Sequence, residues 1–342
     1  MIKEYDVVFY FKSINSIGGV ESFFYYLSQK YKNIVVYYRE GDPIQVQRLA
    51  QNVEVHRYKN EIIKCNKFFC NYGLDIEVEA KEKYHIIHCD YKAVKFKPIR
   101  YKDFKYLGVS KLVCDHFTEL TGEDAEVVYN PIVLKKPTVE KKKGLHLISA
   151  TRLSSEKGGW RIDRLAEILD KAGVEYTWDV YTNQNCVFQS PNIHVRPPKL
   201  DLTKEIAEAT YLVQLSNAEA FCYSVVEALM LGTPVIITPL PVFDEIKITD
   251  KEAIRVDFDM RNVDIDKIVK RLDKINWKPP KDNWGKYLDN NTTYNPNDLV
   301  EVEIKRKYFD ILLQRYTNRH EIVKVPKARA SYLEVKKLCD YP

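Results

Sequence analysis

Residues 211–238 read YLVQLSNAEAFCYSVVEALMLGTPVIIT and carry the strongest fold signal in the chain. The run 211–216 is short and mostly apolar, as expected of a buried strand, and apolar residues then recur at helical spacing through 224–231. A Gly-Thr-Pro sequence ends the helix, and a second apolar run follows at 234–238. A strand, a helix and a strand in this order predict one unit of a parallel sheet that helices cover on both faces.

The same alternation extends in both directions from this unit. In the second half of the chain, we expect further strands at 144–150, 176–182 and 253–256, with helices at 159–172 and 202–209. In the first half, we expect strands at 5–11, 33–38, 52–58, 67–72, 84–89 and 106–109, with helices at 19–30, 43–50, 75–83 and 110–121. Two such series predict two doubly wound, Rossmann-like α/β domains that face each other across a ligand cleft.

One segment interrupts the alternation. Residues 130–143, NPIVLKKPTVEKKK, hold two prolines and five lysines and resemble a linker in composition. We therefore expect an N-terminal domain at 1–134, a linker at 135–143 and a C-terminal domain at 144–297. For 298–342 we expect helices that cross back to the N-terminal domain.

The composition is that of a globular protein. The chain has 342 residues, a formal net charge of +5 and 12% aromatic residues, which excludes a largely disordered protein. Its seven cysteines form no CxxC pair, so neither a disulfide framework nor a zinc site is indicated. The long apolar stretch from Val225 to Phe243 contains Glu227 and prolines and does not predict a spanning helix. We expect a cytoplasmic protein, with the inner face of the membrane as a place of peripheral contact.

Two glycine pairs follow predicted strands and open predicted helices. Gly18-Gly19 comes after the first strand, where exposed backbone N–H groups can approach an anion. Gly158-Gly159 ends a turn that also contains Arg152 and Lys157, and two such cations can clamp a diphosphate. The alternative interpretations are a plain glycine turn for the first pair and a solvated basic turn for the second.

A pair of glutamates brackets the loop and helix start of the opening stretch. Glu219 lies in the loop, and Glu227 lies about one turn into the helix. The first N–H groups of that helix, near Cys222 to Ser224, have no helical acceptor and can hold a phosphate, while a carboxylate further along takes ribose hydroxyls. The alternative for Glu227 is a glutamate that the helix dipole favours, although apolar neighbours indicate a buried, paired carboxylate.

At these motifs the sequence resembles the retaining nucleotide-sugar glycosyltransferases of GT-B architecture, in particular glycosyltransferase family 4. Glu219 and Glu227 match the E-x7-E motif of that family, and the match continues through Ala-Leu-Met-Leu-Gly-Thr-Pro-Val. The turn 150–158 is similar to its phosphate-binding turn, and residues 18–21 are similar to its N-terminal glycine loop. The resemblance is most specific in residues 145–240.

The resemblance implies a site and a reaction. It implies that Arg152 and Lys157 bind the diphosphate, that Glu227 binds the ribose and that Glu219 touches the sugar. His88, at the end of a first-domain strand, would face the donor sugar, with His85 as an alternative expected on the same strand face. The implied catalytic residues are His88, Glu219, Lys157 and Arg152. The implied nucleotide-sugar-binding residues are Gly18, Gly19, Arg152, Lys157, Glu219, Phe221, Cys222, Tyr223, Ser224 and Glu227.

The implied reaction transfers a hexose-type sugar from a nucleotide-diphosphate donor, with UDP-sugar favoured, without a cofactor or metal. Expected acceptors are a glycan, a lipid-linked intermediate, a polymer or a protein, as in polysaccharide and cell-envelope biosynthesis. Two DxD patterns, at 257–259 and 264–266, are better explained by helix capping than by metal binding. Where the family usually has a glycine pair before a glutamate, this chain has residues 239–245, PLPVFDE.

The stretch 92–105 mixes lysines and an arginine with aromatic residues. Such a stretch suits an anionic acceptor, a membrane surface or a nucleic acid, and a solvated loop is the plain alternative. Two rival functions therefore stay open: a nucleic-acid-binding or base-modifying protein that uses 92–105, which we consider less favoured, and a nucleotide-sugar epimerase of the same architecture.

Overall fold

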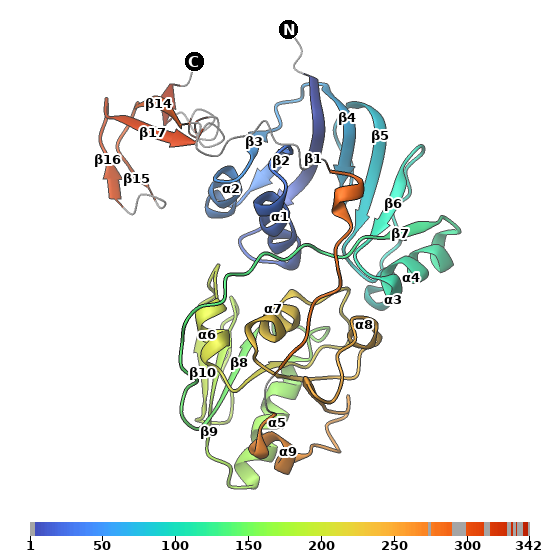
Figure 1. The fold of residues 1–342 in the computed structure, drawn as a ribbon, viewed down its shortest axis with the longest axis vertical. Helices are drawn as coiled ribbons and strands as arrows, with labels where there is room; N and C mark the ends of the chain where they lie inside the picture. The colour runs from blue at the N-terminus through green and yellow to red at the C-terminus, as the bar shows by residue number, and fades with distance from the viewer. Residues whose placement is uncertain are drawn as a thin grey trace.

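The computed structural model describes residues 4–272, 275–288, 299–310, 315–326, 330, 333 and 338–340, and its two halves each contain a parallel sheet (Figure 1). The first sheet has the strand order β3-β2-β1-β4-β5-β6-β7, which reverses between β1 and β4 as in doubly wound folds. Its strands are β1 (Glu4–Ile14), β2 (Val35–Gly41), β3 (Glu54–Arg57), β4 (Ile63–Cys70), β5 (Val78–Ile87), β6 (Lys105–Gly108) and β7 (Ala125–Val127). Its helices are α1 (Gly19–Lys30), α2 (Pro43–Ala50), α3 (Tyr91–Val94) and α4 (Lys111–Thr121).

The second sheet repeats this plan with the order β10-β9-β8-β11-β12-β13, all parallel. Its strands are β8 (Leu145–Ala150), β9 (Tyr176–Tyr181), β10 (Ile193–Arg196), β11 (Tyr211–Gln214), β12 (Val235–Ile237) and β13 (Ala253–Arg255). Its helices are α5 (Gly159–Lys171), α6 (Thr203–Glu208), α7 (Tyr223–Leu231), α8 (Pro241–Glu245) and α9 (Ile265–Lys270). The prediction of two doubly wound α/β domains is confirmed.

The apolar strand sequences are explained by burial on both faces. Consecutive side chains of a strand point to opposite faces, yet residues 7–11 of β1 are all buried. Phe9 and Phe11 pack in one core cluster, and Val8 and Tyr10 pack in another on the other face. Residues of α1 and α2 pack in the first cluster, whereas loop residues, among them Leu74 and Tyr101, pack against the second, so both faces of β1 are covered.

One predicted helix is wrong. We expected a helix at 75–83, whereas β5 begins at Val78 and pairs in parallel with β4, starting with Ile63 opposite Val78. The exposure of successive residues alternates through 78–81, which is the period of a strand rather than of a helix. The sequence 75–83 is rich in charged residues and fits either a helix or a strand. Its pairing with the apolar strand β4 favours the strand.

The chain crosses between the domains twice. Residues 130–143 have no helix or strand, in agreement with the predicted linker. The chain then returns through a 3-10 turn, η1 (Trp284–Lys286), which lies against the first domain in Figure 1. Trp284 is fully buried, with ring centroids 5.3 Å from Phe23 and 6.0 Å from Phe69.

The prediction of helices in 298–342 is wrong for most of the described residues. They form β14 (Leu299–Ile304), β15 (Tyr308–Asp310), β16 (Arg315–Thr317), β17 (Ile322–Pro326) and β18 (Cys339–Asp340). In β14, Val302 and Ile304 are buried whereas Glu301 and Glu303 are exposed, a period of two that belongs to a strand. Residues 282–288, which precede this tail, contact the first domain.

Candidate active site

The candidate site lies at the point where the strand order of each sheet reverses. The loops that leave the carboxyl ends of β1, β8 and β11 carry Gly18-Gly19, the turn 151–158 and the loop 215–222, respectively. Open α/β sheets bind their ligands at this position. In Figure 1, α1 of the first domain and α7 of the second lie near the boundary between the domains, and Tyr26 of α1 contacts Glu227 of α7.

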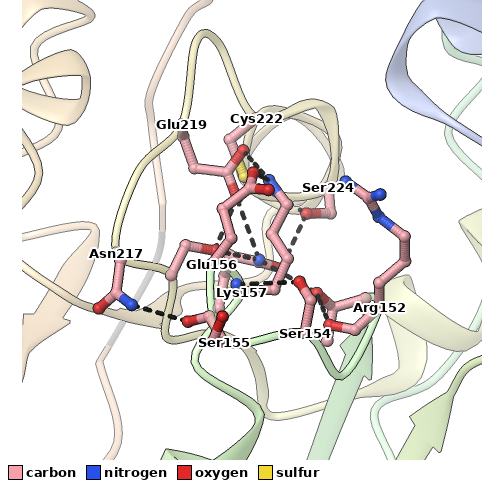
Figure 2. A network of polar contacts seen from close by, with 12 residues as sticks. Arg152, Ser154, Ser155, Glu156, Lys157, Asn217, Glu219, Cys222 and Ser224 are labelled. Atoms are coloured by element: carbon pink, nitrogen blue, oxygen red, sulfur yellow. Dashed lines mark hydrogen bonds and ion pairs between the residues drawn. The ribbon is translucent and has the colours of Figure 1, made fainter. Parts of the chain in front are cut away.

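The turn 151–158 is fixed against the loop that follows β11. Gly158 has a φ of 66°, and a Cβ there would lie 2.0 Å from the carbonyl oxygen of Leu215, so only glycine fits. Asn217 Nδ2 donates a hydrogen bond of 2.7 Å to the Ser155 carbonyl (Figure 2). The basic turn and the glutamate loop thus form one unit.

Lys157 and Glu219 form a buried ion pair in this unit (Figure 2). The Lys157 Nζ donates to Glu219 Oε2 at 2.9 Å and lies 3.3 Å from Glu156 Oε1. The side chains of Lys157 and Glu219 are only 16% and 9% exposed. Burial opposes the charge on Lys157, but the carboxylate of Glu219 outweighs it and raises the pKa of Lys157. The ammonium therefore stays charged at the end of β8.

The sequence analysis missed Gln214, which connects the parts of this site. Gln214 is 3% exposed, and its Nε2 donates to Ser216 Oγ at 2.7 Å and to Glu219 Oε1 at 3.2 Å. Its Oε1 accepts a hydrogen bond of 3.3 Å from Ser224, and Nε2 also reaches Thr151 Oγ1 at 3.4 Å. A polar residue inside the otherwise apolar run 211–215 was the available signal.

The start of α7 presents backbone donors. Cys222 precedes the helix in the left-handed region, with a φ of 68°, and makes no side-chain cap. Strain of this kind in a residue other than glycine is often found at functional sites. The N–H groups of the first turn have no acceptor within the helix, so they can bind an anion. Phe221 and Tyr223 are buried, so they line this start from the core side.

Glu227 contacts the other domain. The hydroxyl of Tyr26, on α1, donates a hydrogen bond of 2.7 Å to Glu227 Oε1. Burial raises the pKa of Glu227 to about 7, although the hydrogen bond from Tyr26 acts in the opposite direction. Glu227 is thus a half-buried, paired carboxyl, and the partner that its apolar neighbours predicted comes from a helix 201 residues away in sequence.

The two histidines of the strand 84–89 lie in different surroundings, contrary to the expectation of a shared face. His85 is fully buried between Tyr101 and Tyr106, whereas His88 lies beside Phe23 of α1, with ring centroids 4.7 Å apart. Positions three apart in a strand would point to opposite faces, and β5 ends at Ile87, so His88 already lies in the loop that follows. Burial lowers the pKa of His88 to about 3, so its imidazole is neutral, and its Nε2 has no hydrogen-bond partner among the described residues.

The first domain approaches the basic turn from the opposite side. Arg152 is exposed, and its guanidinium makes no contact with the other residues drawn in Figure 2. Burial raises the pKa of Tyr72, in the first domain, to about 12. The charges of Cys89 and Glu21 act in the same direction, whereas the charge of Arg152 opposes the rise. The charge of Arg152 therefore acts on Tyr72 of the first domain, in the loop after β4. A Cβ on Gly19 would meet open space, whereas one on Gly18 would lie 2.3 Å from Glu21 Oε2, so the Glu21 carboxylate lies against this helix start.

The two DxD patterns behave as caps and turns. Asp264 accepts a hydrogen bond of 2.9 Å from the Lys267 backbone N–H at the start of α9, and Asp259 accepts one of 3.1 Å from the Arg261 N–H. Within the described part of the chain, no group of three or more His, Cys, Asp or Glu side chains is placed to hold a metal ion. Among the same residues, no helix has the length and apolar character needed to cross a membrane.

Comparison with known proteins shows which solved structures have a similar fold. No family model and no curated protein matches the chain. Among solved structures, HepE of Anabaena, in complex with UDP and glucose, is 13% identical, with a TM-score of 0.58 over 74% of this chain and 86% of its own. WaaG, a glycosyltransferase of lipopolysaccharide biosynthesis, is 12% identical, with a TM-score of 0.53 over 78% of this chain and 89% of its own.

A glycosyltransferase from Rickettsia africae is 11% identical, with a TM-score of 0.54 over 74% of this chain and 84% of its own. The chain has the GT-B fold.

In this GT-B chain a contact across the domain boundary involves the divergent segment 239–245. The carboxylate of Glu245 accepts hydrogen bonds from the backbone N–H groups of Lys111 at 2.6 Å and Leu112 at 3.1 Å. Glu245 therefore caps α4 of the first domain and is occupied by that role.

Proposed function

We propose that the protein is a retaining glycosyltransferase that transfers a hexose-type sugar from a nucleotide-diphosphate sugar, with UDP-sugar as the favoured donor, and that it belongs with glycosyltransferase family 4. The observation that carries the proposal is the arrangement of Arg152, Lys157 and the start of α7 at the switch point of the second sheet. The GT-B fold supports it, and HepE of that fold was solved with UDP and glucose.

The chemistry of the reaction explains why these groups are needed. Breaking the anomeric C–O bond leaves negative charge on the diphosphate, and preorganised donors stabilise such charge as it develops. In the proposal, the guanidinium of Arg152 donates two hydrogen bonds to phosphate oxygens, and Lys157 supplies a positive charge. The N–H groups at the start of α7 complete the anion site without a metal. Glu227 accepts the ribose hydroxyls.

The sugar side of the site is assigned to Glu219 and His88. Glu219 Oε1 already accepts hydrogen bonds from Ser216 at 2.7 Å and Gln214 at 3.2 Å, so its orientation is fixed before the donor arrives. His88 is neutral and has an unused Nε2, which suits a hydrogen bond to a sugar hydroxyl. Both are proposed as catalytic residues at the reacting face.

The acceptor in this proposal is a glycan, a lipid-linked intermediate, a polymer or a protein, and the stretch 92–105 is the proposed point of peripheral membrane contact. Several of its cations have partners: Lys92 contacts Glu119, Lys105 contacts Glu82, and Arg100 lies 4.0 Å from Glu123. This neutralisation argues against a continuous nucleic-acid surface. No second acidic constellation found among the described residues favours an epimerase.

Nucleotide binding gives the first test. Calorimetric titration of the wild type with UDP should show binding, and a thermal-shift assay should show stabilisation of about 2.7 kcal/mol at a hundred times Kd. Arg152→Ala should weaken UDP binding without unfolding the chain, because the Arg152 side chain is exposed. Absence of binding by the wild type to any nucleotide diphosphate would contradict the proposed function.

Donor hydrolysis gives the second test. Lys157→Ala should lower kcat by about 100- to 1,000-fold, because charge on the leaving diphosphate grows in the transition state. The matched control is Lys171→Ala, since Lys171 lies on the surface of α5 with its side chain 72% exposed. If Lys157→Ala keeps kcat within a few-fold of the control, the diphosphate is held elsewhere.

A further inference from the structure

Tyr26 lies across one turn of α7, although it belongs to the other domain. Its ring packs on Tyr223 with centroids 5.5 Å apart, and its hydroxyl donates to Glu227 at 2.7 Å. Residues 223 and 227 are four apart on α7, so they share one face of the helix. Tyr26 is only 7% exposed, which places the phenol in the boundary between the domains.

This contact reaches the part of α7 that the proposed function assigns to the nucleotide. Ser224 takes part in the Gln214 network at the phosphate end, and Glu227 lies three residues further along the same helix. Glu227 Oε1 accepts the hydrogen bond from Tyr26, and Oε2 makes no hydrogen bond with the described residues. Glu227 is half-buried, so the residue is not sealed from solvent.

We propose that Tyr26 is a positioning residue for the ribose subsite, which holds the Glu227 carboxylate in its ionised form and in its orientation from across the domain boundary. The proposal rests on the proposed function in that it takes Glu227 to bind ribose. It makes the ribose subsite a joint product of α1 and α7. An isolated second domain would hold the same carboxyl without its hydrogen-bond donor.

The charges around Glu227 are consistent with this role. Burial raises the pKa of Glu227, while Tyr26 from α1 and Arg48 from α2 lower it. Asp201, in the loop before α6, raises it. Tyr223, on the same helix, is itself a protonated phenol because burial raises its pKa. With a pKa of about 7, the Glu227 carboxyl is divided between its two forms at neutral pH, so the loss of one donor changes its charge.

The stability of the ligand-free protein tests the positioning step without any nucleotide. The folded chain keeps the Glu227 proton up to a pH of about 7, whereas the unfolded chain releases it near 4.5. The stabilisation from this proton is therefore present below the unfolded pKa and is lost as the pH rises through the folded pKa. Tyr26→Phe removes a hydrogen bond to the charged form of Glu227, so the folded-state pKa of Glu227 should rise by about one unit. The pH at which the decrease in the free energy of unfolding ends should rise by the same amount.

Three variants make this readout specific. Glu227→Gln should lack the titration, which assigns it to this carboxyl. Tyr25→Phe should leave the titration where it is in the wild type, since the Tyr25 ring packs on Arg48 and the variant keeps that ring. If Tyr26→Phe titrates as the wild type does, the proposal is overturned whether or not the protein binds nucleotides.

Nucleotide affinity tests the link to ribose. UDP affinity should be measured as a function of pH for the wild type and Tyr26→Phe, and the midpoint of its pH dependence should be about one unit higher in the variant. The titration of the UDP phosphate is the same for both proteins and does not affect this difference. For 2′,3′-dideoxyuridine diphosphate, the two proteins should bind equally. Tighter UDP binding by Tyr26→Phe would show that Tyr26 competes with ribose and would overturn the proposal. Absence of UDP binding by the wild type would instead overturn the proposed function and, with it, the ribose assignment.

Discussion

Gln214 illustrates how one neutral side chain arranges the charged residues of the candidate site. An amide has two hydrogens to donate and one oxygen to accept, and Gln214 uses both groups on the loop, the turn and α7. Because the residue is 3% exposed, water cannot replace these hydrogen bonds. Its partners Ser216, Glu219 and Ser224 therefore depend on it for their orientation.

Gln214→Leu tests this dependence. The variant keeps the approximate volume but leaves buried hydrogen-bonding groups without a partner, which typically costs about 1–3 kcal/mol of stability. We expect kcat of donor hydrolysis to fall by about 10- to 100-fold, because a small displacement of reacting groups has an effect of that size. UDP affinity should change less, since Arg152 is not held by Gln214.

The matched control is Gln47→Leu, a substitution of another buried glutamine, on α2 of the first domain. Both variants are measured well below their unfolding temperatures. Equal kcat for the two variants would assign Gln214 a purely structural role.

The stretch 92–105 shows what an element decides about charged side chains. The short helix α3 and the loop after it bring Lys92 to Glu119, so this lysine is neutralised. Lys95, Lys97 and Lys102 of this stretch are exposed, and so is Phe96, which is 70% exposed. An exposed aromatic side chain with lysines around it is typical of contact with an anionic membrane surface.

The triple variant Lys95→Ser, Lys97→Ser, Lys102→Ser tests the membrane contact. Each lysine near an anionic surface contributes about 1 kcal/mol, so we expect binding to vesicles that contain an anionic lipid to be largely lost. UDP binding should be unchanged, because the diphosphate groups lie in the other domain.

The control replaces Lys251, Lys270 and Lys278 by Ser and has the same net charge; these three lysines are exposed in the second half of the chain. Vesicle sedimentation compares the two proteins. If both bind equally well, the stretch 92–105 is an ordinary solvated surface.

At the scale of the whole molecule, two chain crossings and a few polar contacts set how the domains meet. The crossings are the linker 130–143 and the segment 275–288. Between the domains, Glu245 caps α4 and Tyr26 contacts Glu227. Irregular crossings of this kind can act as hinges, and hinge closure excludes water from a donor site.

Small-angle scattering tests closure. Saturating UDP-sugar should reduce the radius of gyration of the wild type, because the proposed donor site takes Arg152 and Lys157 from the second domain and His88 from the first. Glu245→Ala should enlarge the difference between the free and bound forms, since α4 then loses its cap from the second domain. An unchanged radius in both proteins would indicate a cleft that is already closed without nucleotide.

Local sequence patterns predicted most strands of the two sheets, although not the short strands β7 and β10, and they predicted that the candidate residues follow strand ends. Apolar runs, helical spacing and glycine pairs act over a few residues, so 211–238 alone specified a β-α-β unit and its loop. The same logic failed at 75–83 and in 298–342. There, mixed charged and apolar residues fit either period, and strand pairing in the folded chain decided between them.

Tertiary structure alone decided which candidates meet and in what state. Lys157 and Glu219 are 62 residues apart, and Tyr26 and Glu227 are 201 residues apart, so no local pattern reports either contact. The role of Gln214 and the opposite placement of His85 and His88 also depend on burial. Burial removes water from these groups, and their charges and hydrogen bonds are then set by whichever distant side chain the fold brings to them.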